Sequence, residues 1–171
     1  MQKSVWAPWR VDYLKGLTAP EDAVNGGDAD CFMCAACDLE PGSAAGDAAL
    51  LIAADDLTLV MLNRYPYANG HLLVMPRRHV PSLTALEPAE RAAMMEHAAH
   101  AEAVLRDAVH AQGCNVGVNV GQAAGAAVPG HVHLHVVPRW SGDVNFMSTV
   151  AGLRVIPEAL EAAFTAVRAA W

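Results

Sequence analysis

Short apolar runs separated by turn-forming residues occupy the middle of the chain. Runs of about four to eight residues with this pattern are typical of β-strands, and they predict strands over residues 49–53, 57–62 and 71–75. Asp55-Asp56 supplies a tight turn between the first two strands. Residues 63–70, which contain Asn, Pro and Gly, supply a longer loop before the third strand.

A single long helix is predicted after the third strand. Pro88 stands near its first turn and Gly113 stands just past its end, which are positions that these residue types favour. The apolar residues between them recur at spacings of three and four and so form one apolar face. They are Met94, Ala98, Ala101, Leu105 and Ala108.

Two further strands and a final helix complete the pattern. The strands are predicted over residues 114–120 and 131–137, and Pro157 opens a helix that runs towards Trp171. The expected fold class is therefore α+β, with an antiparallel five-stranded sheet, the long helix on one face and a C-terminal helix.

The length and composition favour one folded domain. A chain of 171 residues with 54% hydrophobic and 17% charged residues is long and apolar enough to bury a substantial core. We expect a single domain over residues 1–171. It divides into an N-terminal segment (1–48), a central core (49–140) and a C-terminal extension (141–171).

The net charge and the cysteines limit the partners and the cellular compartment that we expect for the protein. A net charge of -7 argues against nucleic-acid or membrane-surface partners, because those interactions use basic surfaces. The opening residues lack an apolar leader and no segment predicts a membrane span, so we expect a cytoplasmic protein. In a reducing compartment the four cysteines favour metal binding over disulfides.

Three histidines alternate with aliphatic residues near the C-terminal end. Successive side chains of a strand point to opposite faces, so His131, His133 and His135 share one face. The residues between them, Val132 and Leu134, lie on the other face with the core. Three imidazoles in a row are costly in an ordinary core, which leaves metal binding and catalysis as explanations.

A C-x-x-C pair offers part of a metal site. Cys31 and Cys34 can present two thiolates to one zinc ion, and His79 with His131 would complete a Cys2His2 set. Such a structural site contributes on the order of 10 kcal/mol to folding. Two alternatives stay open: the pair is a chance or redox pair, or Cys37 replaces a histidine as a ligand.

The remaining histidines suggest covalent catalysis beside the metal. Same-face neighbours on a strand are about 6.6 Å apart, which suits His133 as an imidazole nucleophile next to a structural zinc. The glycine-rich loop over residues 117–130 can turn its N–H groups towards an anion, although a plain surface loop has the same composition. Together with Arg77, Arg78 and Arg139, these features indicate phosphoryl or nucleotidyl chemistry.

The triad segment resembles the signature of the histidine-triad (HIT) nucleotide-binding family. That segment reads His131-Val132-His133-Leu134-His135-Val136-Val137, and residues 62–67 and 70–74 match at the expected distance upstream. The resemblance covers residues 49–140. Trp6-Ala7-Pro8-Trp9-Arg10 and residues 138–146 are similar to a bacterial branch of the family that contains diadenosine tetraphosphate phosphorylases.

The resemblance implies a mechanism and a set of roles. His133 would attack an α-phosphate to form a nucleotidyl-histidine, and His135 would bind the phosphate. Asn63 would contact the ribose, while Asn119 and the loop at Gly125 would hold the phosphate. Release by water or by inorganic phosphate stays open. The family also implies a homodimer and a zinc held by two cysteines, an upstream histidine and the first triad histidine.

One departure from the family affects the expected activity. Ala126-Ala127 stands where many members carry a serine or threonine whose hydroxyl contacts the phosphate. The missing hydroxyl would remove roughly 1 kcal/mol of binding free energy. The backbone amide at Ala127 still offers a donor. Trp140 has two equal interpretations, stacking on the nucleotide or packing in the fold.

The expected function is cleavage of dinucleoside polyphosphates of the diadenosine tetraphosphate type. Three alternatives stay open. They are a purine nucleoside phosphoramidase, a zinc-stabilised nucleotide sensor with little turnover, and a catalytic zinc bound by the triad itself.

Overall fold

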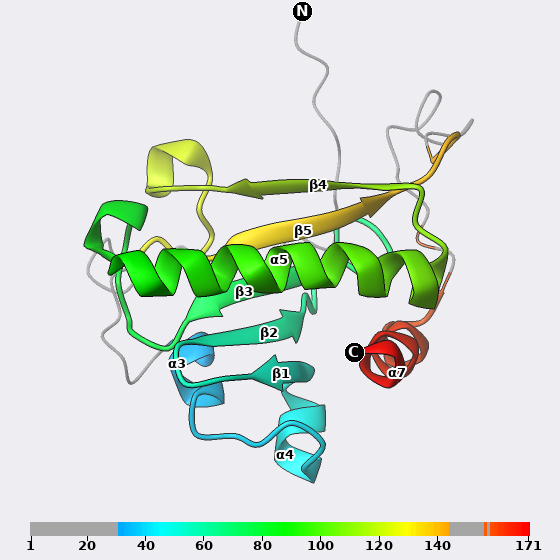
Figure 1. The fold of residues 1–171 in the computed structure, drawn as a ribbon, viewed down its shortest axis with the longest axis horizontal. Helices are drawn as coiled ribbons and strands as arrows, with labels where there is room; N and C mark the ends of the chain where they lie inside the picture. Colours follow the sequence, from blue (N-terminus) through cyan, green and yellow to red (C-terminus); the bar gives the residue numbers. More distant parts are fainter. Residues whose placement is uncertain (1–30, 144–155, 157) are drawn as a thin grey trace, which may run out of the picture.

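The computed structural model describes residues 31–143, 156 and 158–171, and its centre is a five-stranded antiparallel sheet (Figure 1). The strands lie in the order β1-β2-β3-β5-β4, and each neighbouring pair is antiparallel. The expected α+β fold with its five-stranded sheet is confirmed. The strands are β1 (Leu51–Ala54), β2 (Thr58–Leu62), β3 (Leu72–Pro76), β4 (Gly113–Val118) and β5 (Leu134–Arg139).

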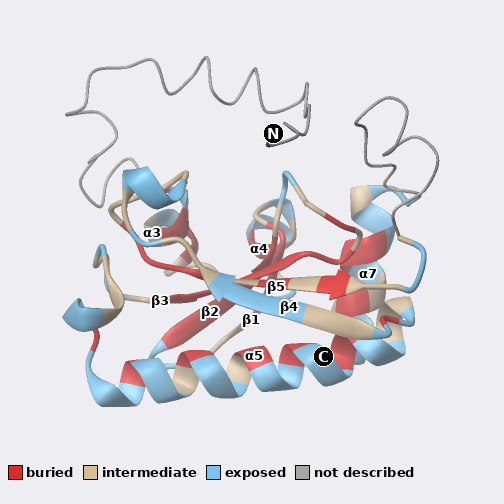
Figure 2. Ribbon diagram, turned by 90° about the horizontal axis from the view of Figure 1, so that it is seen from above, coloured by how far each residue is buried: buried red, intermediate tan, exposed pale blue. Residues whose placement is uncertain are grey.

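Helices cover both faces of this sheet (Figure 2). The long helix α5 (Pro88–Val109) crosses one face, and α7 (Leu160–Ala170) packs against α5 and β1. The short helices α3 (Phe32–Ala36) and α4 (Ala44–Ala48) lie on the opposite face. The 3-10 helices η2 (Leu83–Ala85) and η3 (Gln122–Ala124) lie in connections. The sequence pattern predicted α5 and a C-terminal helix, but not α3 or α4.

The two faces of the sheet bury two separate apolar clusters. Val60 and Leu62 of β2 pack under α5, whereas Leu59 and Met61 of the same strand pack with α3. Because both faces of β2 and β3 are covered, every residue of these strands is buried. This explains why their sequences are continuously apolar instead of alternating.

The ends of α5 follow from its sequence. Glu87 and Glu90 form a capping box around Pro88, which occupies the first turn. His110 ends the helix in the left-handed conformation, so Gly113 begins β4 and does not cap the helix. The predicted apolar face is buried against the sheet at Met94, Ala98, Ala101 and Leu105. Ala108 is partly buried and packs against the same cluster.

The last strand differs from its predicted span. β5 begins at Leu134, and not at His131, because the N–H of Val132 donates to the carbonyl of Val80 (2.7 Å). The alternation nevertheless persists, since Val132, Leu134 and Val136 all lie in the cluster under α5.

Some sequence predictions fall on residues that the structure does not describe. The Trp6–Arg10 segment, Pro157 and residues 144–146 lie outside the described residues. Within the described ranges, no helix has both the length and the apolar character needed to cross a bilayer.

Candidate functional site

Four Cys and His side chains meet where α3, the end of β3 and the start of the triad segment come together. The ligand atoms of Cys31, Cys34, His79 and His131 all lie within 4.8 Å of one another. Cys34 Sγ is 3.2 Å from Nδ1 of His79 and 3.5 Å from Nδ1 of His131. These are the four residues that the spacing predicted, although they lie up to a hundred residues apart in sequence.

The donor set fits a tetrahedral zinc ion. Zinc bonds to sulfur and nitrogen of about 2.3 and 2.0 Å put those atoms about 3.5 Å apart at a tetrahedral angle. The observed N···S distances for His131 are 3.4 and 3.5 Å. The Nε2 of His131 lies 2.8 Å from the carbonyl of Pro76, which can only accept, so Nε2 carries the proton. Nδ1 therefore offers its lone pair to the metal.

Two neighbours of this cluster have other roles. The Sγ of Cys37 donates to the carbonyls of Met33 and Arg77, both at 3.4 Å, and Cys37 is not part of the cluster. A Cβ added to Gly130 would lie 2.9 Å from Nε2 of His79, so a side chain there would require this imidazole to shift. Gly130 therefore borders the Cys/His cluster although it belongs to the glycine-rich loop.

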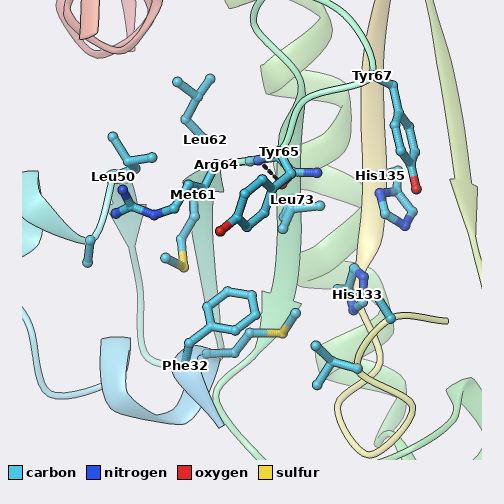
Figure 3. A pocket seen from close by; sticks show the side chains of 15 residues that line it. Phe32, Leu50, Met61, Leu62, Arg64, Tyr65, Tyr67, Leu73, His133 and His135 are labelled. Atoms are coloured by element: carbon cyan, nitrogen blue, oxygen red, sulfur yellow. Dashed lines mark hydrogen bonds between the residues drawn. The ribbon is translucent and has the colours of Figure 1, made fainter. Parts of the chain in front are cut away.

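His133 points into a pocket with one ring nitrogen free to react. Its Nδ1 lies 2.9 Å from the carbonyl of His131, which fixes the proton on Nδ1. The other nitrogen, Nε2, then carries the lone pair and faces the pocket (Figure 3). Burial lowers the pKa of His133, while its hydrogen bond to His131 acts in the opposite direction. The side chain is thus a neutral imidazole held in the tautomer that a nucleophile needs.

A fourth histidine fixes the tautomer of His135. The backbone N–H of Tyr67 donates to Nδ1 of His71 (3.1 Å), so the proton of His71 is on Nε2. That N–H donates in turn to Nδ1 of His135 (3.0 Å). A neutral His135 therefore carries its own proton on Nε2, where it can serve as a donor to substrate. Tyr67 also stacks against His135 with ring centroids 5.7 Å apart.

His71 stays neutral throughout the physiological pH range. Burial, followed by the nearby His135 and His133, lowers the pKa of His71 from 6.5 to about 3. A charged His71 would direct a second N–H at the backbone N–H of Tyr67. The chain Tyr67, His71, His135 thus has one proton arrangement.

A cavity of about 420 Å³ opens beside the two pocket histidines (Figure 3). Apolar side chains of β2 and β3, such as Met61 and Leu73, form its floor together with Met33 of α3. Phe32 and Tyr65 also line it and are 51% and 48% exposed. Its size and lining suit a flat apolar group bound next to a reactive imidazole.

Four of the predicted substrate residues line the pocket: His133, His135, Asn63 and Ala127. Asn119 and Gly125 lie on the connection from β4 to β5, outside the pocket lining, and Gly125 ends η3 in the left-handed conformation.

Trp140 packs in the fold and lies outside the pocket lining. Its Nε1–H donates to the carbonyl of Val109 at 3.2 Å, and its ring packs against the cluster under α5.

The three arginines that suggested an anion site are engaged elsewhere. Arg77 donates to the carbonyl of Cys37, Arg78 pairs with Glu90, and Arg139 pairs with Asp143. Arg64 lines the pocket instead, and its guanidinium donates to the carbonyl of Ala48.

The sequence pattern places His71 near the site as a structural residue, with a role in supporting the triad as the alternative. Phe32, Tyr65 and Arg64 were not predicted as site residues. The two exposed aromatics carried a signal, since Phe32 lies within the C-x-x-C pair and Tyr65 lies within the matched segment 62–67.

Comparisons with known proteins agree with this geometry. The HIT domain family model matches residues 47–142. The AP-4-A phosphorylase of Mycobacterium tuberculosis is 36% identical over 157 residues, covering 91% of this chain and 77% of that protein. The bis(5'-nucleosyl)-tetraphosphatase (asymmetrical) of Schizosaccharomyces pombe is 36% identical over 89 residues, covering 52% of this chain and 48% of that protein.

A solved structure is also similar. A Zn-bound histidine triad family protein from Mycobacterium smegmatis has a TM-score of 0.66 and 32% identity, and the match covers 84% of this chain and 94% of that one.

Proposed function

Because the chain belongs to the HIT domain family, we propose that it is an enzyme that cleaves dinucleoside polyphosphates of the diadenosine tetraphosphate type. The similarity to a mycobacterial AP-4-A phosphorylase over most of both chains supports this substrate class. The observation that carries the proposal is the arrangement of His133, a neutral imidazole whose proton is held on Nδ1 and whose Nε2 faces the pocket.

The first step is attack by Nε2 of His133 on an α-phosphorus. An N–P bond forms, and the P–O bond to the adjacent bridging oxygen breaks, so that ATP leaves from diadenosine tetraphosphate. The Nε2–H of His135 is directed by His71 to donate to the reacting phosphate. Asn63 lines the same pocket and would contact the ribose, as the family resemblance implies.

The second step returns His133 to its starting state. Inorganic phosphate attacks the adenylyl group and gives ADP, whereas water gives AMP. Phosphorolysis and hydrolysis therefore share the intermediate and differ only in the acceptor.

We propose that Cys31, Cys34, His79 and His131 hold a structural zinc ion. When bound, the metal supplies a rigid link between α3 and the residues before β5, and no chemistry at phosphorus. His131 joins the two sites, because its ring is a ligand and its carbonyl accepts the hydrogen bond that orients His133.

A homodimer is part of the same proposal, on the basis of the family resemblance. β4 lies at the edge of the sheet, and its Val116 is 46% exposed, which suits contact with a second copy. Light scattering coupled to size-exclusion chromatography measures this directly. A monomer at micromolar concentration would contradict it.

Product analysis tests the proposed activity. The protein is incubated with diadenosine tetraphosphate, with and without inorganic phosphate, and the nucleotides are separated by anion exchange. ADP plus ATP that forms only with phosphate identifies a phosphorylase, and AMP plus ATP in both conditions identifies a hydrolase. Intact substrate in both conditions refutes the proposal.

A nucleotide sensor with little turnover is the second candidate. Ala127 lines the pocket at the segment where many family members carry a hydroxyl, and its methyl group offers no such donor. Tight AMP binding without cleavage of dinucleotides or of adenosine phosphoramidates would favour the sensor. Cleavage of the phosphoramidate alone would instead favour a nucleoside phosphoramidase.

A further inference from the structure

Phe32 exposes an aromatic ring although it adjoins a cluster of buried residues. It lies between Cys31 and Cys34, with 51% of its surface exposed, while Cys31 and Met33 on either side are buried. Its ring is directed into the pocket from α3, and Tyr65 enters the same pocket from the loop after β2 (Figure 3). Two half-exposed aromatic rings in one pocket are typical of a surface that a flat ligand covers.

The position of these rings identifies the part of a nucleotide that they would contact. His133 and His135 lie at one side of the cavity, whereas Phe32 and Tyr65 lie away from them, near Leu50 and Met61 (Figure 3). A nucleotide with its α-phosphate at His133 would extend its base towards these apolar side chains. A nucleobase stacks on aromatic rings regardless of its identity.

The segment that carries Phe32 depends on contacts with other elements. α3 has five residues and no side-chain cap at Cys31, and isolated helices of that length do not persist in water. Its ties are the buried side chains of Met33 and Ala36 and the two thiols that meet His79 and His131. A metal ion in this cluster would fix the backbone on both sides of Phe32.

We propose that Phe32 and Tyr65 are the nucleobase-binding walls of the pocket, and that zinc at Cys31 and Cys34 controls base affinity by holding Phe32 in place. This rests on the proposed nucleotide function. Binding energies are reciprocal, so a nucleotide that contacts Phe32 must tighten zinc binding by the factor by which zinc tightens nucleotide binding.

The affinity for AMP tests whether Phe32 and Tyr65 contact the nucleobase. Calorimetry on the zinc-loaded protein should give a dissociation constant about tenfold higher for Phe32→Ala and for Tyr65→Ala, the loss expected for one stacking contact. The affinity for ribose 5-phosphate, which lacks the base, should stay unchanged. Met95→Ala on α5, a residue with 55% exposure outside the pocket lining, serves as the control and should leave both constants unchanged.

The affinity for zinc tests the coupling between zinc binding and nucleotide binding. It is determined by competition with a chromophoric chelator, with and without AMP at the same multiple of each protein's dissociation constant. AMP should raise zinc affinity about tenfold in the wild type. The same rise is expected in Tyr65→Ala, because the loop that carries Tyr65 holds no zinc ligand. In Phe32→Ala, AMP should raise zinc affinity by less than about twofold. An equal rise in all three proteins would mean that zinc acts through folding as a whole, and would overturn the coupling.

The outcomes separate this proposal from the catalytic one. AMP binding and its zinc dependence need no turnover, so they can hold even where diadenosine tetraphosphate stays intact. Conversely, active protein whose AMP affinity is the same in Phe32→Ala and wild type would overturn the assignment of the base walls and leave the catalytic proposal standing.

Discussion

The buried His71 predicts a specific acid sensitivity of the folded protein. Its pKa is lowered from 6.5 to about 3, mainly by burial and then by His135 and His133. Between these two values the unfolded chain binds a proton that the folded chain does not. The contribution of neutral His71 to the free energy of unfolding is therefore fully present above pH 6.5 and is lost as the pH falls towards 3.

The size of the effect follows from the two pKa values. Between pH 7 and pH 5 the proton taken up by unfolded His71 lowers the free energy of unfolding by about 2 kcal/mol. Burial lowers the pKa of His133 in the same direction, so the whole protein loses more than this. A variant that removes only the His71 contribution isolates it.

His71→Gln is that variant, because glutamine offers a donor and an acceptor but does not titrate. Urea unfolding followed by far-ultraviolet circular dichroism, on zinc-saturated protein at both pH values, gives the free energies. The loss between pH 7 and pH 5 should be about 2 kcal/mol smaller in His71→Gln than in the wild type. Met95→Ala, at an exposed position on α5 that does not titrate, should match the wild type.

Equal losses in wild type and His71→Gln would refute the argument. They would mean that His71 is protonated in the folded protein, and the fixed tautomer of His135 would then lose its basis.

Three further predictions concern the nucleophile, the metal and the fold. His133→Ala should still bind AMP but form no nucleotidyl adduct in intact-protein mass spectrometry, with cleavage lowered about 10⁴-fold or more; an adduct of unchanged yield would show another nucleophile. Cys34→Ser should hold well under one zinc per chain by elemental analysis and unfold at lower urea concentration, whereas one full equivalent of zinc would contradict the ligand assignment. Gly70→Ala should lower the free energy of unfolding by about 1–2 kcal/mol, because Gly70 has φ of +74° and the new Cβ would lie 3.0 Å from Leu105 Cδ2. A Gly70→Ala protein as stable as wild type in urea unfolding would mean that the loop relaxes at no cost.

Periodicity and spacing predicted those parts of the molecule that depend on local pattern. The alternation around His133 placed the imidazoles and the aliphatic side chains on opposite sides, and the aliphatic ones lie in the core as expected. The C-x-x-C spacing, combined with two histidines at strand ends, predicted a cluster whose atoms do meet within 4.8 Å. In both cases a short motif constrains geometry strongly.

Features that depend on contacts between distant segments were not predictable in this way. The start of β5 depends on a hydrogen bond from Val132 to Val80, in the connection after β3, which no local pattern reveals. Arg77, Arg78 and Arg139 lie near the motifs in sequence, but fold partners take up their guanidinium groups. His71 gains its place in the site only because β3 pairs with β5, which puts Leu73 opposite His135.

The glycines before the triad are needed for two different reasons. Gly130 leaves room for the ring of His79, because a Cβ there would lie 2.9 Å from its Nε2. Gly121 and Gly125 have open space around them, but their φ values of +80° and +85° are ones that residues with a Cβ rarely adopt. A substitution at Gly130 therefore acts first on the Cys/His cluster, whereas a substitution at Gly121 or Gly125 acts first on the path of the backbone between β4 and β5.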